Sequence, residues 1–95
     1  MEQYIVNGKV FLDGSFQEKT IGIEGGCLHI FPKEEKPADG AAVYNAEGKK
    51  VVPGFIDVHT HGAVGVDVNA ASAEELGKIG HFMATQGTTS WLCSI

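Results

Sequence analysis

One segment in the middle of the chain, Val51-Val52-Pro53-Gly54-Phe55-Ile56-Asp57-Val58-His59-Thr60-His61-Gly62, restricts the possible folds more than any other. Its Pro-Gly pair ends whatever element precedes it, and the residues that follow have the composition of a strand. Alternate side chains of a strand share a face. We therefore predict a strand over residues 55–61, which carries Phe55, Asp57, His59 and His61 on one face.

The two faces of this strand predict different surroundings. Ile56, Val58 and Thr60 are β-branched and suit packing under a helix. The face with a carboxylate and two imidazoles would be costly to bury without partners. A divalent metal ion at the end of the strand would satisfy both imidazoles, so we predict His59 and His61 as metal ligands. The spacing alone also fits two ordinary histidines in a core or a loop.

In this interpretation Asp57 lies on the same face of the strand as the two histidines. We predict that its carboxylate orients an imidazole or a neighbouring strand and does not bind the metal itself. The alternative is a strand carboxylate that faces solvent.

Length and charge limit the function classes. The chain has 95 residues and a formal net charge of −5, which disfavours nucleic acid and anionic membranes as partners. No apolar run approaches the roughly 18 residues that cross a bilayer, and the N-terminus lacks a secretory pattern. The only cysteines, Cys27 and Cys93, are far apart. We expect reduced, buried thiols in a cytoplasmic protein.

Residues 1–52 have the pattern of an antiparallel β module. Asn7-Gly8 lies between two short apolar runs and predicts a hairpin turn. Asp13-Gly14 and Gly25-Gly26 predict two further turns. Residues 33–40 are charged and contain a proline, so we expect an exposed loop there.

Residues 53–95 follow a different pattern. After a glycine-containing loop over 62–69, Ser72 and Glu75 have the spacing of a capping box and predict a helix over 73–86 that Gly87 ends. Its apolar face consists of Leu76, Ile79, Phe82 and Met83. We expect residues 90–95 to form another strand, which would give one β-α-β unit with parallel strands.

A single β-α-β unit leaves its strand edges and faces uncovered. We therefore expect an N-terminal piece of a longer protein, with a β-rich part over 1–52 and the start of a second domain over 53–95. The alternative is a complete small α+β domain.

These residues resemble the amidohydrolase superfamily, whose Pro-Gly-x-x-Asp-x-His-x-His motif ends the first strand of a barrel. Pro53, Gly54, Asp57, His59 and His61 match its fixed positions. Within the superfamily, the chain looks most like the N-acetylglucosamine-6-phosphate deacetylase family. The features that suggest this family are Gly62, the segment Gly65-Val66-Asp67, and Gly87-Thr88-Thr89-Ser90.

The resemblance implies an α/β fold: half of a β-sandwich, followed by the first β-α-β of a metal-dependent (β/α)8 barrel. It implies hydrolysis of the acetamide of an amino-sugar phosphate, with a divalent metal ion, zinc, that activates a water molecule. His59 and His61 would be two of the ligands, and the catalytic Asp would lie beyond residue 95. The fragment alone would be inactive, and the whole enzyme a homodimer.

Two alternatives stay open at this point. One is another amidohydrolase of the dihydroorotase, hydantoinase or acyl-amino-acid deacylase type, since these share the motif. The other is a non-catalytic β module that serves in association.

Overall fold

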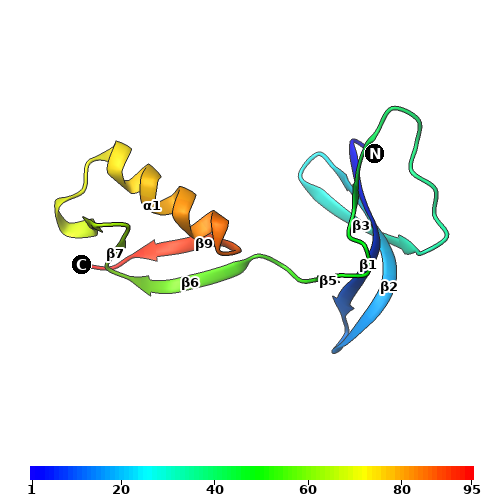
Figure 1. The fold of residues 1–95 in the computed structure, drawn as a ribbon, viewed down its shortest axis with the longest axis horizontal. Helices are drawn as coiled ribbons and strands as arrows, with labels where there is room; N and C mark the ends of the chain where they lie inside the picture. The colour runs from blue at the N-terminus through cyan, green and yellow to red at the C-terminus, as the bar shows by residue number, and fades with distance from the viewer. The chain divides into compact units, whose positions relative to one another are not determined.

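The computed structural model describes residues 1–95 and divides the chain into two compact units, Met1–Val52 and Pro53–Ile95 (Figure 1). The first unit contains strands alone, and the second contains four strands, one α-helix and one short 3-10 helix. No helix combines the length and the hydropathy that crossing a bilayer requires. The predicted β-rich character of residues 1–52 is confirmed by the five strands of the first unit.

The first unit is one five-stranded sheet. β1, β2 and β3 form an antiparallel meander, whereas β4 and β5 both run parallel to β1. The expectation of a purely antiparallel module is wrong, because the chain after β3 crosses to the other edge of β1 before it pairs again. The strands are β1 (Gln3–Leu12), β2 (Ser15–Glu24), β3 (Cys27–Pro32), β4 (Ala42–Asn45) and β5 (Lys50–Val51).

The turns of this sheet correct one prediction and confirm two. Asn7-Gly8 makes no hairpin, because β1 continues through it with an irregularity in register between Ile5 and Gly8. Asn7 lies at this bulge and has a positive φ of 59°. The tight turns are instead Asp13-Gly14, between β1 and β2, and Gly25-Gly26, between β2 and β3, and all four residues have positive φ.

The small core of the first unit lies between β1, β2 and the segment after β4. Its buried side chains are Tyr4, Val10, Thr20, Ile21 and Ala46. The predicted exposed loop over 33–40 is confirmed for all its residues except half-buried Pro37.

The expectation of buried thiols is wrong for both cysteines, which are free and exposed. Each lies at the end of a strand: Cys27 begins β3 after the Gly25-Gly26 turn, and Cys93 ends β9 (Thr88–Cys93). Strand ends have fewer neighbours on either face, so a small apolar side chain there does not reach a core.

The second unit is the predicted β-α-β arrangement. β6 (Phe55–Thr60) pairs with β9 in parallel, and α1 (Ala73–Thr85) connects them (Figure 1). The segment expected as a glycine-containing loop is more ordered than predicted. It contains a two-stranded hairpin, β7 (Gly62–Ala63) with β8 (Val66–Asp67), and the 3-10 helix η1 (Val68–Ala70).

Helix α1 has the predicted start and end. The Ser72 hydroxyl accepts the Glu75 amide at 3.2 Å, and the Glu75 carboxylate accepts the Ser72 amide at 3.2 Å, so the capping box is confirmed. The hydrogen bond from the Ser72 amide, followed by one that the Ser72 hydroxyl donates to the same carboxylate at 3.1 Å, lowers the pKa of Glu75. Gly87 follows the helix with φ 84°, as a C-terminal glycine should. Ile79 and Met83 are buried, but Phe82, which was expected on the same apolar face, is 38% exposed.

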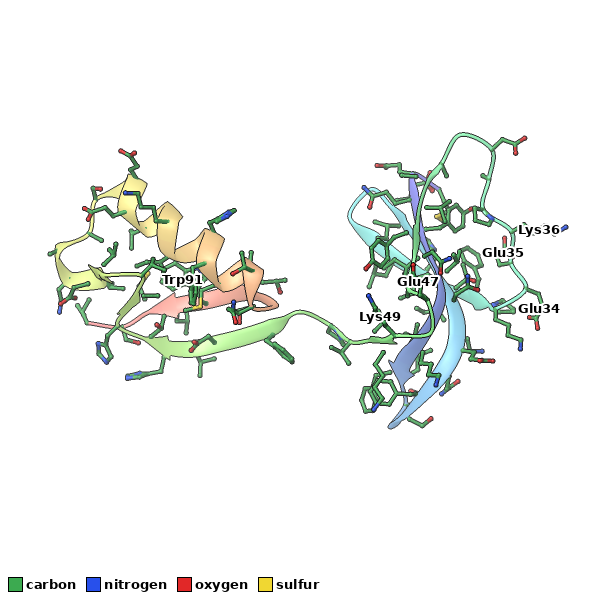
Figure 2. All side chains as sticks on the ribbon, in the orientation of Figure 1. Glu34, Glu35, Lys36, Glu47, Lys49 and Trp91 are labelled. Carbon is green, nitrogen blue, oxygen red and sulfur yellow. The ribbon has the colours of Figure 1, made fainter.

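The expected packing of Ile56 and Val58 under the helix is wrong, since they are 69% and 66% exposed. Helix α1 instead lies against β9, where a Cβ on Gly80 would be 3.6 Å from Nε1 of Trp91 (Figure 2). Trp91 pairs in register with Asp57, and paired residues share a face of the sheet. The half-buried Asp57 side therefore faces the helix, and the β-branched side does not.

The backbone at Gly54 lies so close to β9 that only glycine fits there. A substitution at this position therefore tests the packing of β6 against β9. A Cβ at Gly54 would lie 2.8 Å from Cβ of Thr89, so no rotation of the threonine side chain relieves the overlap. We expect Gly54→Ala to lower the free energy of unfolding by about 1–3 kcal/mol in chemical denaturation. Gly77→Ala is the control, because a Cβ there meets nothing within 4 Å. It should leave stability unchanged or raise it by up to about 1 kcal/mol. Equal stability of Gly54→Ala and the wild type would contradict the packing.

Candidate functional site

The two predicted ligands lie at the carboxyl end of β6. His59 is the last residue but one of the strand, and His61 follows the strand directly, before β7. Both side chains are exposed. Because the peptide turns into β7 immediately afterwards, the two rings stand at the edge of the sheet, where loops begin.

The two imidazole rings converge. Nε2 of His59 lies 3.0 Å from Nε2 of His61, with ring centroids 4.7 Å apart and planes at 81°. Two nitrogen ligands at a tetrahedral angle on one zinc ion lie about 3.3 Å apart, given Zn–N bonds of about 2.0–2.1 Å. The observed pair therefore fits two positions around a single metal ion. A ligand role for these histidines remains a prediction.

Asp57 contacts the main chain of His59 and not its ring. Its Oδ1 accepts the His59 amide at 3.0 Å, as aspartate side chains often do with the residue two positions on. The register between β6 and β9 is irregular between Asp57 and Thr60, so simple alternation does not hold across His59. The carboxylate thus fixes the backbone from which the imidazole projects.

Ser94 is a neighbour of His59 that the sequence interpretation missed. Its Oγ lies 3.3 Å from Nδ1 of His59, and its amide donates to the carbonyl of Thr60 at 2.8 Å. The available signal was the β-α-β pattern itself, because parallel strands end at the same edge of a sheet. A residue just after the second strand should therefore reach the end of the first.

The hairpin of β7 and β8 and the residue after it fix the main chain of His61. The carbonyl of His61 accepts the amide of Val68 at 2.8 Å, and the Asp67 side chain caps η1 by accepting the Asn69 amide at 2.9 Å. A Cβ on Gly62 would lie 3.1 Å from the carbonyl carbon of Val66, and φ of Gly62 is 153°. Only glycine fits this close approach of two backbones, so the histidine pair is followed by a glycine for a steric reason.

The donor set of this chain is incomplete for a catalytic metal. No group of three or more His, Cys, Asp or Glu side chains in residues 1–95 is placed to hold a metal ion. Catalytic zinc sites normally have three protein ligands. His59 and His61 therefore fit part of such a site.

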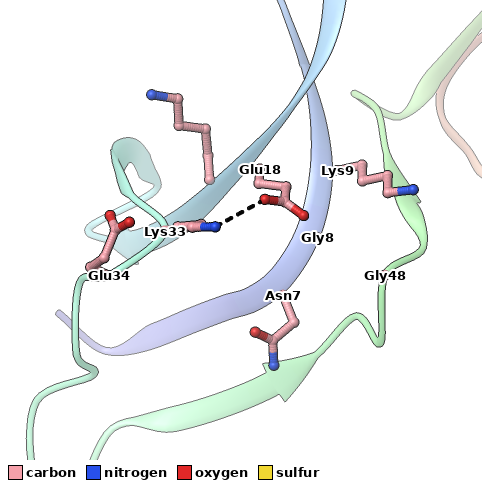
Figure 3. A pocket seen from close by; sticks show the side chains of 8 residues that line it. Asn7, Gly8, Lys9, Glu18, Lys33, Glu34 and Gly48 are labelled. Carbon is pink, nitrogen blue, oxygen red and sulfur yellow. Dashed lines mark hydrogen bonds and ion pairs between the residues drawn. The ribbon is translucent and has the colours of Figure 1, made fainter.

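A separate hollow of about 430 Å³ occurs within the first unit (Figure 3). Nζ of Lys33 pairs with Oε2 of Glu18 at 3.2 Å across it. Lysines and glutamates both line this hollow, so their charges oppose each other, and it offers no distinct anion or cation site. The lining residues are Asn7, Gly8, Lys9, Glu18, Lys19, Lys33, Glu34 and Gly48.

The contact of Asp57 with the His59 amide predicts a difference between two substitutions. Asp57→Ala removes the acceptor and should lower the free energy of unfolding by about 1 kcal/mol. It should also speed hydrogen exchange at the His59 amide. Asp57→Asn keeps an acceptor oxygen and should retain most of the protection, measured by amide exchange in NMR. Loss of protection to the same extent in both variants would show that this contact does not hold the strand.

The chain is similar to dihydroorotases over part of its length. It is 39% identical over 57 residues to the dihydroorotase of Staphylococcus aureus, 34% over 55 residues to that of Lactobacillus leichmannii, and 32% over 62 residues to that of Enterococcus faecalis. These matches cover 58–64% of this chain but only 13–14% of each relative. No family model matches the chain. The partial similarity agrees with the amidohydrolase resemblance and does not select the deacetylase family within it.

Proposed function

We propose that this chain carries the first metal-binding motif of a metal-dependent amidohydrolase, an enzyme that hydrolyses a C–N amide bond. The observation that supports this most strongly is the approach of the His59 and His61 Nε2 atoms to 3.0 Å at the end of β6. The partial similarity to dihydroorotases supports the same class of reaction.

Each residue of the site has a distinct role in this proposal. His59 and His61 would hold a divalent metal ion, zinc, through their Nε2 atoms. A bound metal of this kind supplies a Lewis acid that polarises an amide carbonyl and lowers the pKa of a water molecule. Asp57 fixes the His59 backbone, so that one imidazole keeps its direction toward the other.

Two imidazoles need further ligands, and the reaction needs a group that protonates the departing amine. We place these groups in other segments of a longer protein, on later strands of a (β/α)8 barrel that β6, α1 and β9 begin. In this proposal the enzyme is a homodimer, and residues 1–52 contribute half of a β-sandwich.

The substrate is one of two kinds. The resemblance of the segments around Gly62 and Gly87-Thr88-Thr89-Ser90 to the deacetylase family favours the acetamide of N-acetylglucosamine-6-phosphate, which would give glucosamine-6-phosphate and acetate. The similarity to dihydroorotases favours a cyclic amide such as dihydroorotate about equally. Both are small molecules whose C–N bond the same chemistry opens.

A direct assay of the zinc-loaded full-length protein distinguishes the two substrates. Release of acetate from N-acetylglucosamine-6-phosphate would identify the deacetylase, and ring opening of dihydroorotate would identify the cyclic amidohydrolase. Turnover of neither compound would contradict both substrate assignments.

The ligand assignment predicts loss of metal on substitution. Replacing both His59 and His61 with alanine in the full-length protein should weaken zinc binding by more than about tenfold, the smallest effect typical of groups that merely support a ligand. Zinc content after dialysis, measured by atomic emission, checks this. The matched control replaces His29 and His81, which are exposed and lie outside the site. Unchanged zinc content in the His59/His61 variant would refute the assignment.

A further inference from the structure

We infer that Ser94 is a positioning residue for His59: its hydroxyl oxygen accepts a hydrogen bond from Nδ1 of His59 in the state in which Nε2 binds the metal. The inference rests on the proposed function, because it concerns the ligand atom that His59 presents. It adds to the site a residue that directly follows a second strand, β9.

The geometry holds His59 at two points. Its amide donates to Oδ1 of Asp57 at 3.0 Å, and its Nδ1 lies 3.3 Å from Oγ of Ser94. Ser94 is itself anchored, since its amide donates to the carbonyl of Thr60 at 2.8 Å and its side chain is half-buried. The remaining ring nitrogen, Nε2, is the one that lies 3.0 Å from His61.

The chemistry of imidazole makes this second contact consequential. A neutral imidazole carries one N–H, and the other nitrogen has the lone pair that binds metal. If the hydrogen sits on Nδ1, the Ser94 oxygen accepts it and Nε2 is the ligand. If it sits on Nε2, the serine donates to Nδ1 and the ring cannot bind metal from its His61 side. A bound metal selects the first state, and in that state Ser94 supplies the acceptor for the Nδ1 hydrogen.

Nδ1 of His59 has no other hydrogen-bond partner in residues 1–95. Histidine ligands almost always donate their second ring N–H to an acceptor, and removal of that acceptor lowers metal affinity by about 10- to 100-fold. Ser94 is in the place that such an acceptor occupies.

The test uses the full-length protein with zinc alone as the probe. We expect Ser94→Ala to weaken zinc binding by about tenfold or more, measured by competition with a chromophoric chelator. In protein labelled with ¹⁵N-histidine, the Nδ1–H resonance of zinc-bound His59 should shift and exchange faster with water. Ser94→Thr keeps the hydroxyl and should restore both. Ser90→Ala is the matched control, because Ser90 lies on β9, the strand that Ser94 directly follows, and its side chain makes no hydrogen bond in residues 1–95.

The outcomes separate this inference from the function on which it depends. Wild-type zinc affinity and an unchanged His59 resonance in Ser94→Ala would overturn the role of Ser94 and leave the His59/His61 site intact. Failure of Ser94→Thr to restore the resonance would overturn it too, because the effect would then come from packing. Zinc binding that survives the loss of both histidines would overturn the inference and the proposed function together.

Discussion

The candidate site depends on the parallel pairing of β6 with β9. The hydrogen bond from the Ser94 amide to the Thr60 carbonyl joins the carboxyl ends of the two strands at 2.8 Å. This hydrogen bond holds Ser94 beside the ring of His59. It also fixes the pairing of the two strands at Thr60, just after the irregularity in their register. The contact that supports the His59 ring is thus a property of a strand pair closed by a helix, because segment 51–62 carries both imidazoles but not Ser94.

The ends of helix α1 make this strand pairing possible. At its start, Ser72 and Glu75 satisfy each other's backbone amides, which fixes where the chain leaves the loop. At its end, Gly87 turns the chain and its carbonyl accepts the Phe55 amide at 2.8 Å, which aligns β9 beside β6. Gly54 then allows Thr89 to approach closely. Local signals at each end of the helix therefore determine a contact between residues far apart in sequence.

Much of this could be predicted from the sequence because the signals were local. The capping box, the two-residue turns at Asp13-Gly14 and Gly25-Gly26, and the β-α-β order each depend on a few neighbouring residues. The sequence interpretation failed where contacts between residues far apart in sequence determine the structure. Asn7-Gly8 has the composition of a turn, but the positive φ of Asn7 occurs at a bulge in the pairing of β1 with β2. The two histidines were identified from their spacing, whereas Ser94, 35 residues from His59, became visible only through the strand register.

The central claim is that the Nε2 atoms of His59 and His61 share one metal ion. Anomalous diffraction at the zinc edge, from crystals of the full-length protein grown with zinc, tests this most directly. The account predicts a peak about 2.0–2.1 Å from Nε2 of each ring. A zinc ion bound elsewhere, or two rings turned away from each other with no peak between them, would contradict it.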